Sequence, residues 1–280
     1  MQKSYLAATI AALAGATSLE YYSNPDKEFQ IDVVPEGFIV YPDGATADVE
    51  VDPGLYPAVF RWPKASPRCG GTMISPRMAL TAAHCVNVSE DDSRSLSMEI
   101  ELQDGNGNYT TYDIVDIRAH DCWWTGENPY GYNSYASDIA FLVLDRDITP
   151  NGGTPVEGTH YLSYWDNSVD GDTLTGETFI LAGWGQSGEI GTEYDDSDQD
   201  GTMTVFNRGY NVVDSISSNM INYTLTNPAD GGLELESMAH YGDSGSGALY
   251  IQNEGEDDEV LRIIGVKSNG STTAYWGSSH

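Results

Sequence analysis

The chain has 280 residues, of which 40% are hydrophobic and 11% are aromatic. This composition excludes an intrinsically disordered protein and allows one or two packed domains. The formal net charge of −31 at pH 7 argues against nucleic acid as a partner, because phosphates would be repelled. The charge favours a solvated acidic surface over the weaker alternatives of basic partners or a saline habitat.

The N-terminus has the features of a secretory signal over residues 1–16. Lys3 precedes a mostly apolar run from Tyr5 to Leu13, and Ala14-Gly15-Ala16 is a small-residue cleavage site. The alternative is a buried N-terminal helix. Residues 17–40 are then expected to be a propeptide or an N-terminal extension. No later stretch is long and apolar enough to cross a membrane, so we expect a secreted, extracellular protein that does not bind membranes.

Short segments of strand character follow, separated by Gly, Asn, Asp and Pro. This pattern predicts an all-β protein built from barrels. The turn-rich segment 147–154 is the predicted boundary between two barrels. The predicted strands before it are Ala58–Trp62, Gly71–Ser75, Met98–Leu102, Tyr109–Ile117 and Ile139–Leu144. Those after it are Thr178–Ala182, Met203–Asn207, Met220–Leu225, Gly247–Ile251 and Val260–Lys267.

Three motifs carry the groups that a serine nucleophile requires. They are Thr-Ala-Ala-His-Cys ending at Cys85, Ser-Asp-Ile-Ala containing Asp138, and Gly-Asp-Ser-Gly containing Ser244. A serine hydroxyl reacts near neutral pH only when a base removes its proton, and the imidazole of His84 titrates in that range. Asp138 can hold the imidazole in the required tautomer and stabilise its protonated form. The order His, Asp, Ser is one of several that assemble such a triad.

With these motifs the chain resembles the trypsin/chymotrypsin-like serine endopeptidases, from about Pro57 to Gly270. The resemblance extends to three further segments, which are Cys69–Ser75, Ala182–Gly185 and Ile263–Gly270. It implies two packed antiparallel β-barrels, with the active site in the cleft between them. The protease domain would span residues 41–280, with barrels at about 45–150 and 155–280. It also implies hydrolysis of protein or peptide substrates through an acyl-enzyme.

The resemblance assigns further roles around the triad. The backbone N–H groups of Gly242 and Ser244 would form the oxyanion hole, and Ser268 would hydrogen-bond the catalytic aspartate. A disulfide between Cys69 and Cys85 would hold the histidine, and export to an oxidising compartment favours its formation.

The cleft would be lined by Met238, Ser268, Asn269 and Gly270. Met238 is six residues before the nucleophile, where trypsin-like enzymes have an aspartate that binds Arg or Lys. A methionine there favours cleavage after large apolar or aromatic residues. A two-residue shift of this loop would instead present Glu234 or Glu236 and favour basic residues.

The sequence departs from the family at its activation segment. Members usually have Ile/Val-Val-Gly-Gly after a cleavable basic residue, and the new N-terminus pairs with the aspartate before the nucleophile, here Asp243. This chain has Ile-Val-Tyr-Pro at 39–42 after Phe38. We therefore expect no trypsin-type zymogen and another partner for Asp243. Ser246 and Gly247 replace the family's Gly and Pro.

Cysteines and acidic loops give weaker signals. Cys122 is left over, either buried and inert or paired with another molecule, and His240 stands where a cysteine usually supports the specificity loop.

Asp196, Asp198 and Asp200, followed by Gly201, match the start of a calcium loop. The twelfth position is Asn207 rather than glutamate. An acidic surface loop is therefore preferred over a structural calcium site, and no cofactor is expected to be required.

Three functions remain open at this stage. The leading hypothesis is a monomeric, secreted serine endopeptidase with protein or peptide substrates. The alternative from another class is a catalytically silent homologue that binds a protein partner through the cleft or the acidic face. An esterase or acyltransferase using the same triad is the third.

Overall fold

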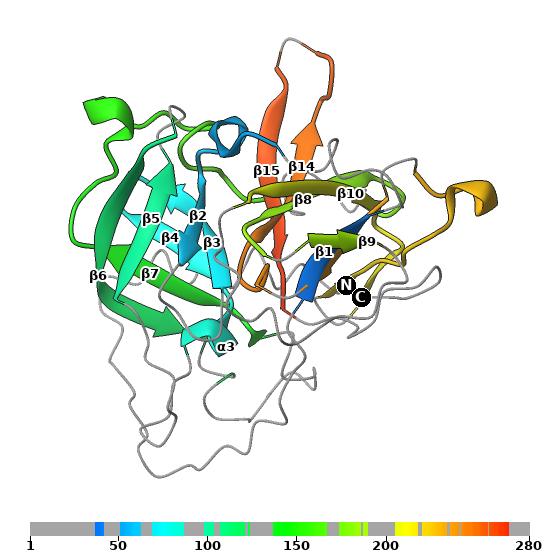
Figure 1. Cartoon of the computed structure of the whole chain (residues 1–280), viewed down its shortest axis with the longest axis horizontal. Helices are drawn as coiled ribbons and strands as arrows, with labels where there is room; N and C mark the ends of the chain where they lie inside the picture. Colours follow the sequence, from blue (N-terminus) through cyan, green and yellow to red (C-terminus); the bar gives the residue numbers. More distant parts are fainter. Residues whose placement is uncertain are drawn as a thin grey trace.

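The computed structural model describes residues 37–41, 51–62, 69–86, 98–103, 107–120, 123, 137–166, 174–185, 187–189, 205–217, 220–233, 236–240, 242–256 and 258–268. Within these residues nearly all regular structure is β-strand, and the one α-helix is the single turn α3 (Ala83–Val86). The strands form two groups that lie side by side (Figure 1). Short 3-10 turns occur at Pro53–Leu55, Pro150–Gly152 and Pro228–Asp230. No described helix is long and apolar enough to cross a membrane.

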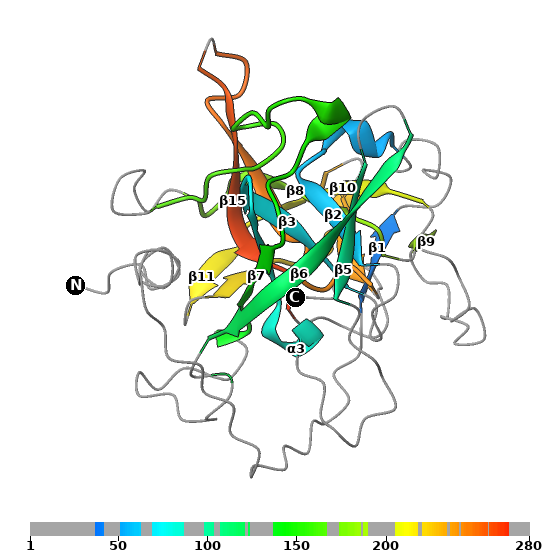
Figure 2. The ribbon, with the colours of Figure 1, turned by 90° about the vertical axis from the view of Figure 1, so that its left-hand side faces the viewer.

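The first group is a closed six-stranded barrel with the strand order β2-β3-β4-β7-β6-β5. Its neighbouring strands are antiparallel, and Figure 2 faces this barrel, with the long strand β6 crossing it. Alternate residues of β5 are buried, which is the pattern of a strand with one face toward a core. The strands are β2 (Val59–Trp62), β3 (Cys69–Ser75), β4 (Met78–Thr81), β5 (Glu99–Gln103), β6 (Tyr109–Ala119) and β7 (Ala140–Leu144).

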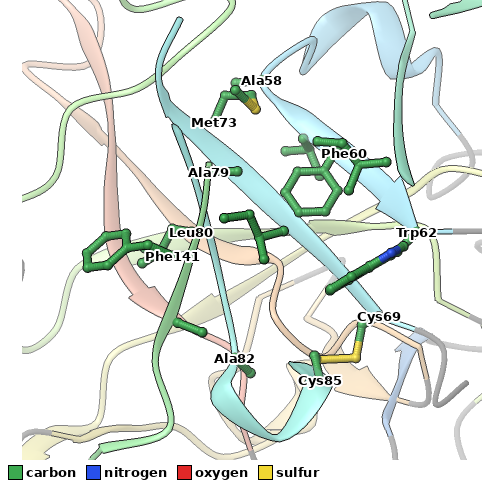
Figure 3. Close-up of a cluster of buried hydrophobic side chains, with 14 of the residues drawn as sticks. Ala58, Phe60, Trp62, Cys69, Met73, Ala79, Leu80, Ala82, Cys85 and Phe141 are labelled. Carbon is green, nitrogen blue, oxygen red and sulfur yellow. A yellow bond between two sulfur atoms is a disulfide. The ribbon is translucent and has the colours of Figure 1, made fainter. Parts of the chain in front are cut away.

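Large side chains fill the barrel and lie against its glycines. Phe60, Trp62, Leu80 and Phe141 are all buried, and Figure 3 shows Trp62 as the one of them nearest to the Cys69–Cys85 disulfide. A Cβ at Gly71 would lie 2.3 Å from the ring of Phe60. That approach is far inside van der Waals contact, so the barrel requires glycine on β3 at this point.

The second group is a four-stranded antiparallel sheet with the order β10-β8-β14-β15. A second core of buried side chains, including Phe179, Tyr223 and Leu225, packs against it. The hairpin β11–β12 comes between β10 and β14 in the sequence and forms a separate two-stranded sheet. The strands are β8 (Thr178–Gly183), β10 (Asn207–Val212), β11 (Ser215–Ser217), β12 (Met220–Asn222), β14 (Gly247–Gln252) and β15 (Val260–Val266).

A third, small sheet contains a strand from the N-terminal part of the chain. Strand β1 (Gly37–Tyr41) lies between β13 (Met238–His240), with which it is antiparallel, and β9 (Ser187–Glu189), with which it is parallel. Figure 1 shows β1 next to β9 in the second half of the molecule. The strand therefore crosses residue 40, the predicted limit of the N-terminal extension, and joins the rest of the fold.

Most predicted strands are found within one or two residues, but one is displaced. Of the segment predicted at Met203–Asn207, the described residues 205 and 206 are not in a strand, and β10 begins at Asn207 and ends at Val212. Five strands without a sequence prediction are present, namely β1, β4, β9, β11 and β13. The 3-10 turn at Pro150–Gly152 lies inside the predicted boundary segment 147–154, where Asn151 has φ of 49°.

Candidate active site

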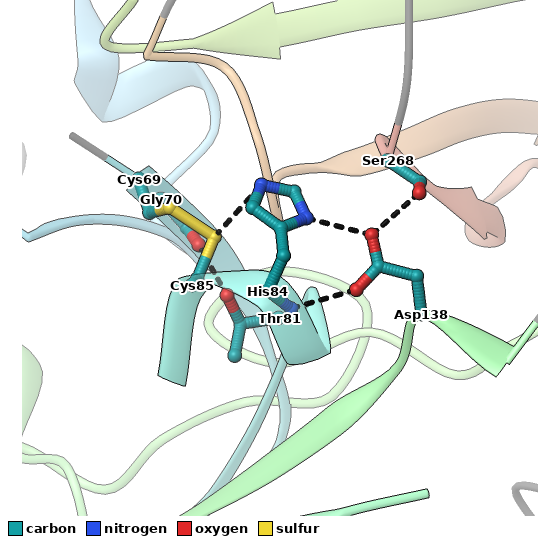
Figure 4. A network of polar contacts seen from close by, with 7 residues as sticks. All are labelled: Cys69, Gly70, Thr81, His84, Cys85, Asp138 and Ser268. Atoms are coloured by element: carbon teal, nitrogen blue, oxygen red, sulfur yellow. Dashed lines mark hydrogen bonds and ion pairs between the residues drawn. A yellow bond between two sulfur atoms is a disulfide. The ribbon is translucent and has the colours of Figure 1, made fainter. Parts of the chain in front are cut away.

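His84 lies on α3, immediately after barrel strand β4. The disulfide between Cys69 of β3 and Cys85 of α3, predicted from the resemblance, is present in the structure. The imidazole Nε2 lies 3.7 Å from the Cys85 Sγ atom, so the ring packs beside the bridge (Figure 4). Joining α3 to the barrel wall limits the positions that the ring can take.

Asp138 is 1% exposed and accepts three hydrogen bonds. Its Oδ1 accepts the backbone N–H of His84 at 2.7 Å, and its Oδ2 accepts from His84 Nδ1 at 2.6 Å. Ser268, which follows β15 in the other half of the molecule, donates its hydroxyl to the same Oδ2 at 2.5 Å. Figure 4 shows His84 and Ser268 approaching the carboxylate from opposite sides.

The acceptor character of Asp138 determines the form of the imidazole. An ionised carboxylate can only accept hydrogen bonds, so the Nδ1 of His84 carries a proton. In the neutral ring the lone pair is then on Nε2, where a base for a serine hydroxyl requires it. The burial and the three donors together keep the side chain of Asp138 in one orientation.

Ser244 lies in a tight turn between Gly242 and Gly245, which have φ of 89° and 83°. These values favour glycine, because a Cβ is strained in this region. The Ser244 carbonyl accepts the N–H of Gly70 at 2.8 Å, so β3 of the barrel holds the turn. The Ser244 side chain is largely buried. Within the described part of the chain, the N–H groups of Gly242 and Ser244 donate to no protein acceptor.

The turn lies directly beside the segment that leads to His84. A Cβ added to Gly245 would lie 2.2 Å from the Thr81 Oγ1 atom and 3.0 Å from the backbone N of Ala82. Thr81 also donates its hydroxyl to the Gly70 carbonyl at 2.8 Å. The structure thus brings together the three sequence motifs, although they are separated by more than fifty residues each.

Asp243, the residue before the nucleophile, is completely buried at the base of the turn. Its Oδ1 accepts the N–H of Gly185 at 3.1 Å. A Cβ at Gly183 would lie 2.2 Å from the same oxygen, so the Gly-Trp-Gly segment is required to leave space for the carboxylate. Burial raises the pKa of Asp243, and the positive charge of Lys267 opposes that shift.

Lys267 is the charged residue near the site that was not identified from the sequence. It follows directly after β15, is 9% exposed, and donates from Nζ to the Ala182 carbonyl at 3.1 Å. Burial lowers the pKa of its ammonium group, and the negative charge of Asp243 opposes this. The available signal was a lone lysine at the end of the apolar run Ile263–Val266.

Comparison with known proteins identifies the family. The model of the family described as Trypsin matches residues 50–276. The chain belongs to the trypsin family. The fold is accordingly the two-barrel chymotrypsin-like fold, as the resemblance implied.

Individual relatives match over part of their length. The chain is 30% identical over 142 residues to the serine protease Hayan of Drosophila melanogaster, covering 48% of this chain and 20% of that protein. It is 27% identical over 151 residues to a venom serine protease of Polistes dominula, covering 49% and 47% of the two chains. A chymotrypsin of Phaedon cochleariae is 25% identical over 122 residues, covering 44% and 40%. The matched part therefore spans less than half of each relative.

In this trypsin-family chain, Met238 and Glu236, the two residues considered for substrate specificity, are both buried. Met238 is 0% exposed and packs in the second core, while its backbone is opposite Val40 of β1. Glu236 is also buried, and its carboxylate accepts the backbone N–H groups of Thr226 and, at 2.8 Å, Leu233. Both acceptor oxygens of Glu236 thus bind main chain. The assignment of Met238 to the substrate cleft stays a prediction.

Other predicted site residues lie outside the described residues. These are Asn269 and Gly270 of the cleft, Glu234 of the alternative specificity loop, Cys122, and the proposed calcium ligands Asp196, Asp198 and Asp200. The N-terminal signal also lies outside this range. For these residues the sequence-based predictions stand as they were made.

Proposed function

We propose that the chain is a secreted serine endopeptidase that hydrolyses peptide bonds through a covalent acyl-enzyme. The observation that carries this proposal is the Asp138 carboxylate, which accepts both His84 Nδ1 and Ser268 Oγ beside the Ser244 turn. The trypsin-family match over residues 50–276 supports the same conclusion.

In the proposed mechanism His84 Nε2 takes the proton of the Ser244 hydroxyl as the oxygen attacks the substrate carbonyl. The protonated His84 then gives this proton to the leaving amine, and an acyl-enzyme forms. Water attacks the acyl-enzyme in the second half of the reaction, with His84 again as the base. Asp138 remains ionised and stabilises the imidazolium.

The oxyanion of each tetrahedral intermediate is proposed to bind the N–H groups of Gly242 and Ser244. This assignment is supported because, within the described residues, neither N–H group donates to a protein acceptor. Donors fixed before the reaction are effective, because no reorganisation is needed as charge develops. Losing one such donor typically reduces kcat by about 10²–10³-fold.

The preferred substrate is proposed to be a protein or peptide with a large apolar or aromatic residue before the cleaved bond. Glu236 is the described acid that a shifted loop would offer to a basic side chain. Its two oxygens instead accept backbone N–H groups of Thr226 and Leu233. An acid already engaged in this way would be a poor partner for Arg or Lys, which supports the apolar preference.

The remaining expectations belong to the same proposal. We propose a monomeric extracellular enzyme with no required cofactor, no nucleic-acid partner and no membrane association. The acidic loop at 196–200 is proposed to be a surface loop rather than a calcium site. Melting temperature measured in EDTA and then in calcium would be unchanged for the surface loop and raised for a calcium site.

Hydrolysis of a peptide library and of simple esters, by wild type beside Ser244→Ala, tests the function. Cleavage of peptides by the wild type alone is the expected result. Hydrolysis of esters without peptides would identify an esterase or acyltransferase. Absence of both activities in a folded protein would favour a catalytically silent binding module.

A further inference from the structure

A buried lysine of the same chain, Lys267, acts electrostatically on the aspartate that precedes the nucleophile. We propose that Lys267 is a positioning residue, whose ammonium group holds the Asp243 carboxylate and thereby the Ser244 turn in an uncleaved chain. The inference rests on the proposed endopeptidase function. It predicts that the enzyme is active with the bond between Phe38 and Ile39 intact.

The side chains of Lys267 and Asp243 converge on the same short segment. Lys267 Nζ donates to the Ala182 carbonyl at 3.1 Å, and Asp243 Oδ1 accepts the Gly185 N–H at 3.1 Å. Gly183 lies between these contacts, and its missing Cβ provides the space for the carboxylate. The ammonium and the carboxylate thus bind the same buried segment, residues 182–185, beside the Ser244 turn.

The backbone of Lys267 binds the same turn. Its N–H donates to the Ser246 carbonyl at 3.0 Å, and its carbonyl accepts the Gly245 N–H at 2.9 Å. A shift of Lys267 would therefore displace Gly245 and Ser246, which directly follow Ser244. This connects Lys267 to the turn whose N–H groups are proposed for the oxyanion hole.

Each charge benefits from the other, because both residues are buried. Burial disfavours the charged form of an acid and of a base alike, and an opposite charge nearby opposes that effect. Breaking such a pair by removing one member leaves an uncompensated buried charge. Asp243 is therefore supplied with a counter-ion before any new N-terminus is formed.

Strand β1 occupies the place beside the specificity loop as continuous chain. Ile39 pairs with Ser187 of β9, and Val40 pairs with Met238 of β13. Strand β1 therefore completes the small sheet by backbone pairing, and we assign the positive charge that acts on Asp243 to Lys267.

Mass spectrometry determines whether the active chain is cleaved between Phe38 and Ile39. The wild-type protein is labelled with a fluorophosphonate, and the labelled species is digested with trypsin. The expected result is an intact peptide of residues 28–61, which spans the Phe38–Ile39 bond. Labelled protein found only with a new N-terminus inside this peptide would overturn the inference. A chain that labels only after limited proteolysis would do the same.

Variants test Lys267 itself, with kcat and KM measured on a peptide substrate. Lys267→Met should lower kcat by about 10²-fold or more, the scale of a lost oxyanion donor, and leave KM nearly unchanged. Lys267→Arg should recover part of kcat, because it restores the charge. Arg262→Met, on the strand β15 that precedes Lys267, is the matched control and should retain wild-type kcat.

Folding and function are separated by a double variant. Asp243→Asn with Lys267→Met removes both charges, so it should melt cooperatively yet remain poorly labelled. A folded Lys267→Met protein with wild-type kcat would overturn the inference while leaving the endopeptidase proposal intact. A wild type that neither labels nor hydrolyses peptides, even after proteolysis, would instead refute the proposed function and the inference with it.

Discussion

Replacing Asp138 by asparagine should remove most activity without removing the side chain's volume. The carboxylate accepts at both oxygens, from the His84 N–H at 2.7 Å and from His84 Nδ1 and Ser268 Oγ at 2.6 and 2.5 Å. An amide has one acceptor oxygen and one NH₂ donor. If the NH₂ group faces Nδ1, the ring proton must move to Nε2, which can then no longer accept the serine proton.

The expected size of this effect follows from the tautomer. The same substitution in the chymotrypsin-like triad lowers kcat about 10⁴-fold. At about 1.36 kcal/mol per tenfold change, this corresponds to about 5.5 kcal/mol of lost transition-state stabilisation. Ser268→Ala is the matched comparison, because it removes one hydrogen bond to a charged acceptor and leaves the tautomer unchanged. Ser268→Ala should lose about 1.5–3 kcal/mol of transition-state stabilisation.

The assay is kcat and KM for both variants and wild type on one peptide substrate, with melting temperature as the control for folding. The predicted order is wild type, then Ser268→Ala, then Asp138→Asn, with the losses mainly in kcat. Activity of a folded Asp138→Asn protein within tenfold of wild type would refute the assigned tautomer. Equal losses in the two variants would refute the distinct role of Asp138.

Three further predictions concern stability and specificity. Gly183→Ala places a Cβ 2.2 Å from a buried carboxylate oxygen and should lower the free energy of unfolding by about 1–3 kcal/mol, measured by thermal melts. Gly265→Ala is the control and should be tolerated, because its Cβ would meet only a methyl group at 3.4 Å. Replacing Cys69 and Cys85 together by alanine should lower the free energy of unfolding by about 3 kcal/mol for a sequence separation of 16, measured by denaturant titration. Glu236→Gln should lower the melting temperature, because both carboxylate oxygens accept backbone N–H groups, and should leave the cleavage preference unchanged. Loss of cleavage after Arg or Lys in that variant would instead assign Glu236 to the pocket.

Local sequence patterns predicted the parts of the site that are formed locally. The Gly-Asp-Ser-Gly turn needs glycines at positive φ, and that requirement is visible in the motif itself. Strand β5 alternates buried and half-buried residues, and β3 and β7 are almost continuously buried apolar runs, so these barrel strands were also visible in the sequence. Strand β10 was displaced because its buried positions include Asn207 and Asn211, which do not resemble a core. Asn211 donates to the Ser237 carbonyl at 2.8 Å, and this pairing becomes evident only in the fold.

The features that sequence patterns did not reveal depend on contacts between distant segments. Lys267 meets Asp243 only after β15 has packed beside the nucleophile turn, and a single lysine after an apolar strand has no local signature. Strand β1 was assigned to an extension because its partners, β9 and β13, lie about 150 and 200 residues further along the chain. Such pairing is specified by tertiary structure rather than by local propensity.

The central claim is that Ser244 is an activated nucleophile in this chain. The most direct measurement is the site of fluorophosphonate labelling in the secreted protein, determined by mass spectrometry, with Ser244→Ala as the control. The account predicts a single adduct on Ser244 in the wild type and none in the variant. Labelling at another residue, or no labelling of a folded wild type before and after limited proteolysis, would contradict it.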